Sequence, residues 1–218
     1  MATTLTYTAG DMCTEALRDA GIVAVDREAS SDEIDVAIIR LNMMLKSLQG
    51  VTVTVWKQTT ASIAMTDATA SYVITERPLD LLTVNKKESG GNEVWLQKLT
   101  RREYYELPDK TTVGEPSSYY YHREKEQGTL YVWTVQATAG TDTIEWTGRA
   151  EISDVAETTD TMEVPAEYYE AILYGLALRL SSAFGTDKPL LPGLAGKAMS
   201  EATGFDTDGS IYFEPEYG

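Results

Sequence analysis

Histidine and cysteine, two residue types that carry much of enzyme chemistry, each occur once in the 218-residue chain, as His122 and Cys13. His122 stands in YYYHREKEQG, on a predicted strand beside a charged turn, which favours a solvated strand residue over a general base. Cys13 falls on the apolar side of a predicted helix, where a buried small hydrophobic role is usual. Arg18 is near, but no cation is adjacent in sequence to lower the thiol pKa. We therefore predict no catalytic residue.

The metal-binding and phosphate-binding motifs are incomplete. DTDGSIYFEPE, residues 206–216, contains part of a calcium-loop pattern, but Gly209 directly follows Asp208 and breaks the required spacing. PGLAGK, residues 192–197, has glycines before a lysine without the spacing of a phosphate-binding loop. No G-x-S-x-G sequence is present, and among 34 acidic residues a chance carboxylate pair carries no specificity. The sequence predicts no metal site and no cofactor.

Four tryptophans support an alternative function. They are Trp56, Trp95, Trp133 and Trp146. Because indole rings can stack on sugars, a carbohydrate-binding or hydrolytic β-rich lobe is one hypothesis. A role in the core or in hairpins is the favoured interpretation, since each ring buries a large apolar area.

The chain is strongly acidic, with 34 acidic and 18 basic residues and a net charge of −16. Tracking of nucleic-acid phosphates needs clustered Lys and Arg, so this function is disfavoured. The basic pairs Lys86/Lys87 and Arg101/Arg102 are predicted to lie at a solvated turn and a helix start, and Arg101 and Arg102 are candidates for subunit or partner contacts. Residues 151–218 contain 13 acidic and 3 basic residues, so −10 of the charge lies there.

The N-terminal segment predicts two helices. Thr8 and Asp11 form a capping-box pattern, followed by apolar residues at three- and four-residue steps and by Gly21 as a left-handed stop. Ser30 and Glu33 form a second capping box before a long apolar stripe that ends at a glycine. The stripe consists of Ile34, Ala37, Ile38, Leu41, Met44, Leu45 and Leu48.

From residue 51 the apolar period changes from that of a helix to alternation, which predicts strands. The expected strands are 51–56, 62–65, 72–75, 79–84, 94–96, 119–122, 130–135 and 141–147. Thr100 and Glu103 predict a capped short helix that is broken by Pro108. Short strands with frequent turns indicate a small antiparallel sheet or sandwich.

The third segment returns to a helical period. Pro165 suits a first helical position, and Glu167 and Glu170 lie near the positive end of the helix dipole. This helix, which Gly185 ends, is apolar nearly all round, so we expect burial on more than one side. A last helix is predicted over residues 192–203.

The order of helices, strands and helices predicts an α+β fold. We expect the terminal helices to form an α-helical bundle from residues 1–50 and 160–204, with an inserted antiparallel β lobe at 51–150 and an extended C-terminal docking tail at 205–218. An aromatic tail without helical period suits docking into a groove of another chain, although folding back onto its own domain is the alternative. Its candidate docking residues are Phe205, Ile211, Tyr212, Phe213 and Tyr217.

Neither a membrane span nor a secretory signal is predicted. The chain has no run of about 18 apolar residues, and its first 17 residues lack a basic region followed by an apolar one. A single cysteine cannot form an internal disulfide, which favours a reducing compartment. A chain of this length buries roughly 70% of its unfolded surface, enough for a sizeable core.

Several stretches of the sequence are informative as an ordered set. A short helix, a spacer, a Ser-Asp/Glu-rich cap and a helix with LNMML at 41–45 follow one another in residues 16–50. The other stretches are TERPLDLLTV at 75–84, residues 99–124, GTLYVWTV at 128–135 and VPAEYYEAILYGLALRLSSAFG at 164–185. Together they resemble the head-to-tail adaptor proteins of tailed bacteriophages, the podovirus-type tail accessory factor or head completion family.

The resemblance implies a structural protein without enzymatic activity. Copies in this family form a ring, usually of twelve, beneath the portal, where the ring extends the DNA channel and carries the next tail component. The implied partners are the portal protein, a downstream tail or neck protein, further copies of the chain, and double-stranded DNA as passing cargo. It also implies portal attachment through the C-terminal segment, and a place in the virion neck after assembly in the host cytoplasm.

The acidic charge agrees with such a conduit, because acidic groups repel DNA phosphates within a Debye length of about 8 Å. We expect the excess to map partly to the channel wall and partly to the portal-facing tail. A different neck protein, such as a tail terminator, is a further alternative.

Overall fold

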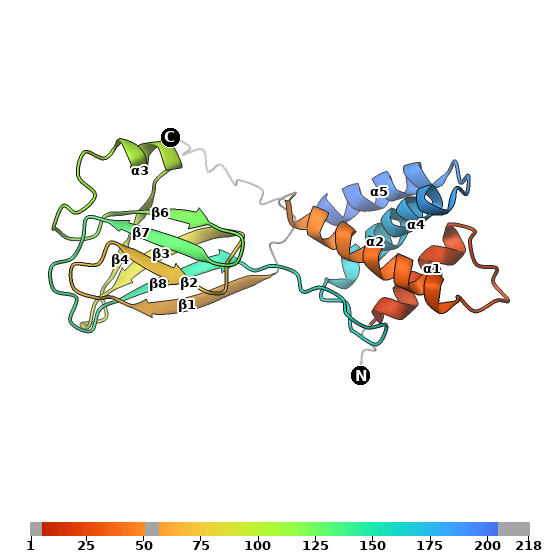
Figure 1. Ribbon diagram of the computed structural model, residues 1–218, viewed down its shortest axis with the longest axis horizontal. Helices are drawn as coiled ribbons and strands as arrows, with labels where there is room; N and C mark the ends of the chain where they lie inside the picture. Colours follow the sequence, from red (N-terminus) through yellow and green to blue (C-terminus); the bar gives the residue numbers. More distant parts are fainter. Residues whose placement is uncertain (1–5, 51–56, 205–218) are drawn as a thin grey trace, which may run out of the picture. The chain divides into compact units, whose positions relative to one another are not determined.

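The computed structural model describes residues 6–50 and 57–204 (Figure 1). The chain divides into two compact units, one from Met1–Thr54 with Ile152–Gly218 and the other from Val55–Glu151. The first unit is helical and the second is built on strands, so the predicted α+β fold class is confirmed.

Helix α1, Ala9–Asp19, begins with the predicted capping box. The Asp11 N–H donates to Thr8 Oγ1 over 3.1 Å, and the Thr8 N–H donates to the Asp11 carboxylate over 3.2 Å. These bonds satisfy N–H groups that have no partner inside a helix. Cys13 lies on the fully buried side, and Gly21 follows the helix with φ of +70°.

Helix α2, Ser31–Gly50, begins with the second predicted capping box. The Ser30 N–H donates to the Glu33 carboxylate over 2.8 Å, and the Glu33 N–H donates to Ser30 Oγ over 3.4 Å. Arg27 donates twice to the same carboxylate, over 2.6 and 3.0 Å. The buried residues of α2 belong to the predicted stripe: Ala37, Leu41, Met44 and Leu45.

Helix α4, Tyr169–Phe184, packs against α1, α2 and α5, Leu191–Gly204. Its burial on more than one side is confirmed. Pro165 stands slightly earlier than predicted, because a 3₁₀ turn, Ala166–Tyr168, separates it from α4. Gly185 ends α4 with φ of +70°, as expected for a left-handed stop.

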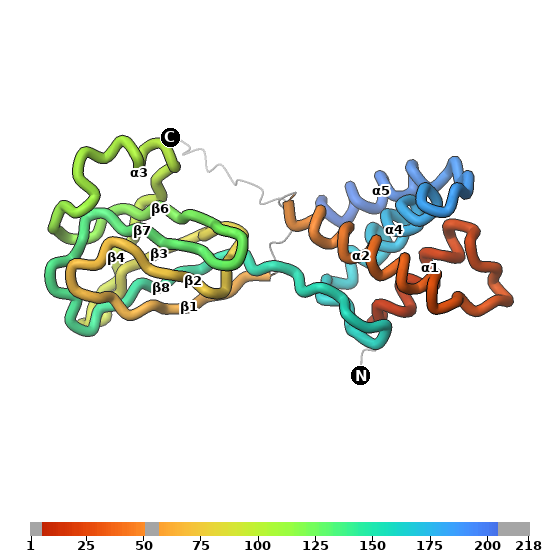
Figure 2. The backbone as a smooth tube through the Cα atoms, in the orientation of Figure 1, coloured from red at the N-terminus to blue at the C-terminus, as the bar shows by residue number. Residues whose placement is uncertain are grey.

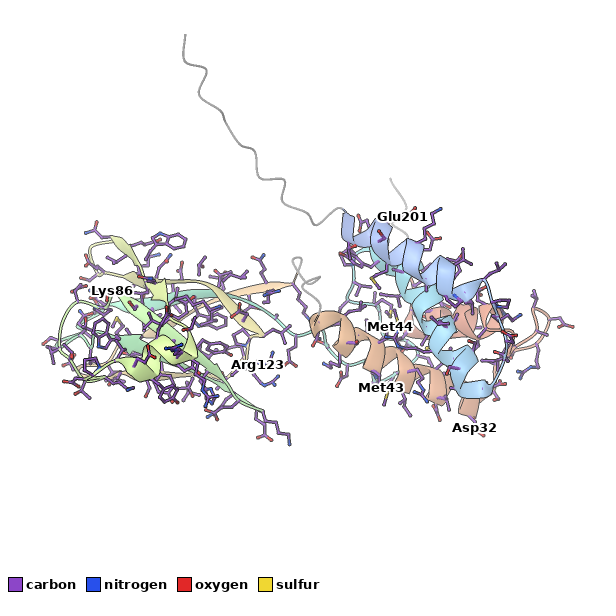
Figure 3. The ribbon with its side chains drawn as sticks, turned by 90° about the horizontal axis from the view of Figure 1, so that it is seen from above. Asp32, Met43, Met44, Lys86, Arg123 and Glu201 are labelled. Carbon is purple, nitrogen blue, oxygen red and sulfur yellow. The ribbon has the colours of Figure 1, made fainter. Side chains whose placement is uncertain are left out.

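Gly175 allows α2 and α4 to approach closely. A side chain at this position would overlap Cε of Met44. Met44 is only 1% exposed, and Figure 3 shows it between α2 and α4. The glycine therefore leaves room for the end of the Met44 side chain between the two helices.

A row of polar side chains on α2 binds the chain where it returns to the helical unit. Asn42 Nδ2 donates to the Val155 carbonyl over 2.9 Å, and Asn42 Oδ1 accepts from the Val155 N–H over 2.8 Å. Lys46 Nζ and Gln49 Nε2 donate to the Ile152 carbonyl over 2.8 and 3.1 Å. The three side chains recur at four- and three-residue steps, so one side of α2 pairs with an extended segment.

The same returning segment contacts the start of α1 (Figure 2). The Ala9 and Gly10 N–H groups donate to the carbonyls of Asp160 and Thr158, each over 2.8 Å. Both donors lie in the first helical turn, where N–H groups lack helical partners. One extended segment thus joins α1 to α2.

The β unit consists of two four-stranded sheets, with strand orders β1-β8-β3-β4 and β2-β7-β6-β5. Among the described strands, every pairing is antiparallel except the short parallel pair of β5 with β6. The strands are β1 (Gln58–Ala64), β2 (Ser71–Ile74), β3 (Asp80–Lys87), β4 (Glu93–Trp95), β5 (Gln97–Lys98), β6 (Ser118–Arg123), β7 (Gly128–Trp133) and β8 (Thr143–Arg149). Of the two predicted arrangements, a small antiparallel sheet or a sandwich, the structure has two mainly antiparallel sheets.

One core lies between the two sheets. Its buried residues come from both sheets and their connections: Met65, Tyr72, Ile74, Leu81, Val84, Leu96, Tyr119, Leu130, Val132, Ala139, Ile144 and Trp146. Alternate residues of β8 are buried, which is the pattern of a strand with one face inward.

The strand predictions differ from the structure mainly in their bounds. The expected strand 62–65 is the end of the longer β1, and the expected strands 130–135 and 141–147 are each displaced by two residues from β7 and β8. The expected strand 94–96 corresponds to β4, which ends before Leu96, and the short β5 was not predicted. The expected strand 51–56 lies outside the described residues. The predicted short helix is α3, Arg101–Glu106, with its capping box between Thr100 and Glu103.

Replacing Asn42 with Ala is expected to lower the free energy of unfolding by about 2 kcal/mol. The substitution leaves the N–H and C=O of Val155 without their partner at a partly buried site. Chemical unfolding followed by circular dichroism measures the change. Ser47→Ala, at an exposed position of α2, is the matched control, and an equal loss in both variants would contradict the assignment.

The Glu33 carboxyl is expected to titrate far below its ordinary pKa of 4.5. The hydrogen bond from Arg27, with the Ser30 N–H, lowers the pKa of Glu33 to about 2. Because the folded pKa is the lower one, this carboxylate stabilises the fold fully above pH 4.5 and loses that effect as the pH falls toward 2. An NMR titration should show this midpoint, and Arg27→Gln should raise it. An unchanged midpoint in that variant would refute the cause.

Candidate functional site

His122 lies on β6, as predicted, and contacts a tyrosine. Its Nδ1 is 3.4 Å from the Tyr120 hydroxyl, and the two rings stack with centroids 6.3 Å apart. A general base needs a hydrogen bond to the proton it removes. The contact to Tyr120 places His122 in an aromatic cluster.

Cys13 is fully buried on α1. Burial raises the pKa of the Cys13 thiol to about 12. The thiol is therefore protonated at neutral pH, whereas a nucleophilic cysteine needs its thiolate form.

The two incomplete motifs form no cofactor site in the described residues. Residues 192–197 lie within α5, so they form part of a helix and not a phosphate-binding loop before one. Residues 206–216 lie outside the described part of the chain. Within 6–50 and 57–204, no group of three or more His, Cys, Asp or Glu side chains is placed to hold a metal ion.

The described tryptophans form no common stacking surface. Trp146 is a core residue, 1% exposed. Trp133 donates from Nε1 to the Asp109 carbonyl over 3.0 Å, while Trp95 is 67% exposed on β4, in the other sheet. Trp56 lies outside the described residues.

Lys86 is buried, so the prediction of a solvated turn is wrong for this residue. Its side chain on β3 is 2% exposed, bonds to Glu115, and places Nζ 3.2 Å from Asp142 and 3.6 Å from Glu88. Burial alone would lower the pKa of Lys86, but its hydrogen bonds to Glu115 and Asp142 outweigh burial and raise that pKa. The charged ammonium therefore links β3 to the two connections that carry Glu115 and Asp142.

Arg101 and Arg102 begin α3, as predicted, and have different surroundings. Arg102 Nε donates to Glu106 Oε1 over 2.7 Å, so Arg102 is paired within its own helix. The Arg101 guanidinium lies 5.7 Å from the ring centroid of Tyr105, which is 57% exposed. Arg101 therefore borders an aromatic surface.

This surface is the exposed side of the tyrosine cluster, formed by Tyr104, Tyr105, Tyr120 and Tyr131 with Lys110. Tyr105 is its exposed ring, whereas Tyr104 and Tyr120 are buried beneath it. Tyr104 stacks on Tyr120 with centroids 5.0 Å apart and lies 5.1 Å from Tyr131. Lys110 Nζ lies 5.5 and 5.8 Å from the ring centroids of Tyr104 and Tyr105. A cation over a tyrosine ring is attracted by its electron-rich face.

Sequence reasoning missed the tyrosine cluster, although one signal for it was present. Tyr119 and Tyr121 of β6 face the core, so alternation places Tyr120 on the opposite side of the sheet. Tyr120 is paired with Tyr131 of β7. Aromatic residues bordered by cations are enriched in protein interfaces, which makes this a candidate partner surface.

The tail residues proposed for docking lie outside the described residues. They are Phe205, Ile211, Tyr212, Phe213 and Tyr217.

The sequence matches the family described as SU10 adaptor protein over residues 7–208. This match covers most of the chain and includes residues of both units. The chain belongs to the SU10 adaptor protein family. The resemblance to phage head-to-tail adaptors is thereby confirmed. A search of curated proteins gave no match.

Membership in the SU10 adaptor family supports a structural role, in which surfaces that bind other chains carry the function. The tyrosine cluster with Arg101 is a candidate for such a surface in the β unit. None of the helices in residues 6–50 and 57–204 combines the length and the hydropathy needed to cross a bilayer.

The Cys13 thiol is expected to be unreactive toward a thiol reagent in the folded adaptor. Burial keeps the reagent from the sulfur, and the raised pKa keeps the thiol protonated. Modification at neutral pH should therefore proceed only after unfolding. A colorimetric thiol assay with and without denaturant measures this. Leu194→Cys, at an exposed position, provides the reactive control. Rapid modification of native Cys13 would show that the site opens.

Proposed function

We propose that this SU10 family member is a structural head-to-tail adaptor that forms a ring under the portal of a tailed phage. The ring extends the DNA channel and provides the attachment platform for the tail. The family match over residues 7–208 carries this proposal, because it spans both units and not one element. The protein acts in the virion neck, after assembly in the host cytoplasm.

The net charge of −16 supports a role in which DNA passes without being held. Tight DNA binding requires many phosphate contacts from Lys and Arg. A ring of several copies, with twelve as the proposed number, multiplies the negative charge around the channel. Repulsion of phosphates within a Debye length of about 8 Å then keeps DNA mobile.

We assign different tasks to the three proposed parts of the chain. The helical bundle, residues 1–50 and 160–204, forms the ring contacts. The β lobe, residues 51–150, presents Arg101, Arg102 and the tyrosine cluster to a neighbouring subunit or to the tail protein below. The tail, residues 205–218, docks into the portal through its aromatic residues. An aromatic anchor gains affinity by filling a pocket on its partner.

Tyr212→Ala with Phe213→Ala is expected to weaken capture by the portal at least tenfold, because two aromatic anchors are removed. Pull-down of the full-length adaptor by purified portal rings measures the loss, and circular dichroism confirms the fold. Ser210→Ala in the same tail is the matched control. Undiminished capture of the double variant would show that the tail is not the anchor.

A cryo-EM map of the virion neck tests the adaptor role itself. A ring of this chain directly under the portal is expected. A ring on the tail side with six subunits would instead indicate a tail terminator.

A further inference from the structure

Two faces of the helical unit expose apolar side chains and carry opposite charges. The α2–α4 face is basic and consists of Ile39, Arg40, Met43, Leu178, Arg179 and Ser182. Five of these residues line one hollow, and Ile39 lies beside them, one turn of α2 before Met43. Ile39 and Met43 are 55% and 59% exposed.

Met43 is exposed although the residue beside it in sequence is buried. Met44, the next residue, is 1% exposed and packs beside Gly175 of α4. Figure 3 shows Met43 on the side of α2 away from Met44. Met43 therefore contributes to a surface and not to the core.

The second face, the α1–α5 face, consists of Glu15, Asp19, Glu170, Tyr174, Lys188, Leu190 and Leu194. Its three carboxylates outnumber its one lysine, and Glu15 is paired with Arg18 over 2.6 Å. The residues of this face line two adjoining hollows, and Tyr174 borders both. Leu190 and Leu194 are 78% and 41% exposed. Leu191, between them, is 5% exposed, so this face also lies beside the core without being part of it.

The charges on the two faces are suited to each other. Arg40, Arg179 and Glu170 form no ion pair in the described part of the chain. Burial lowers the pKa of Arg179, whose guanidinium donates only to the Gly175 carbonyl of its own helix over 3.3 Å. Arg40 and Arg179, both exposed, are therefore available to pair with an acidic surface brought against them.

The two faces share no residue, although on α4 Tyr174 of one face and Leu178 of the other are only one turn apart. Glu170 and Arg179 are nine residues apart on α4, which at 3.6 residues per turn places them about 180° apart around the helix axis. A contact between unlike faces is heterologous, and it generates a closed ring when the rotation between neighbours closes.

We infer that the α2–α4 face of one copy docks on the α1–α5 face of the next copy, and that this repeated contact builds the ring. The inference rests on the proposed adaptor function and adds the surfaces that join neighbouring subunits. Ile39 and Met43 meet Leu190 and Leu194 across the contact, while Arg40 and Arg179 meet Glu15 and Glu170.

Charge reversal tests this contact on full-length protein assembled on portal rings. One variant carries Arg40→Glu with Arg179→Glu, and a second carries Glu15→Lys with Glu170→Lys. Each is expected to reduce the yield of complete rings about tenfold, because like charges then meet across the interface. The variant with all four substitutions restores opposite charges and is expected to restore ring formation.

The outcomes separate this inference from the adaptor function. If the natural chain forms no ring on the portal, the proposed function fails. If it forms rings and the two double variants do so equally well, the contact assigned here is wrong while the function stands. If the fourfold variant stays defective although folded, one face binds the acidic tail or the portal instead, which also overturns the inference.

Cysteine crosslinking gives a second, independent measurement. Met43→Cys with Leu194→Cys is expected to give a ladder of linked copies under mild oxidation on the portal. Met43→Cys alone is expected to give none, because each contact has only one such residue; linked dimers would reveal a symmetric contact and overturn the inference. Buried Cys13 does not interfere. The control pair is Lys125→Cys with Leu194→Cys, because Lys125 belongs to the β unit and is not one of the residues of the α2–α4 face.

Discussion

The helical unit depends on the contact between α2 and residues 152–162, because its helices come from two separate stretches of the chain. Asn42 and Val155 exchange two hydrogen bonds although they are 113 residues apart. The Asn42 amide offers a donor and an acceptor side by side, so it satisfies both backbone groups of one extended residue. The same segment then supplies carbonyls to the first turn of α1. The chain next enters Pro165 and α4, and the returning segment therefore fixes where the central helix begins.

Features that depend on residues a few positions apart could be predicted from the sequence. The three capping boxes at Thr8, Ser30 and Thr100 require only a hydroxyl and a carboxylate three residues later, and all three form. The role of Asn42 could not be predicted in this way. Asn42 belongs to the LNMML stretch, and its partner Val155 is 113 residues away in sequence. The sheet orders depend on distant pairings for the same reason.

The burial of individual residues could likewise be predicted only where it depends on residues close in sequence. Met43 and Met44 are 59% and 1% exposed, although an identical side chain stands at both positions. The helical period predicts Met44 as a core residue, but only the packing around Gly175 shows that Met43 remains uncovered. For Lys86 the sequence predicted a solvent-exposed position. In the structure, Glu115 and Asp142 reach the buried ammonium from two connections and compensate the cost of removing its charge from water. The candidate site at Arg101 could be predicted from charge, but the tyrosine cluster beside it required the register of β6 and β7.

A subunit of a ring must be stable before its neighbours cover it, so its binding faces have to be separate from its core. The helical unit meets this requirement through α4, whose buried residues hold α1, α2 and α5 together while Glu170 and Arg179 project on opposite sides. In the proposed ring, both faces are therefore attached to one rigid helix, and the angle between neighbouring subunits follows from the orientation of α2 and α1 around it. Gly175 leaves room for the end of the Met44 side chain between α2 and α4, so the packing inside the subunit lies directly beside the surface that carries Met43.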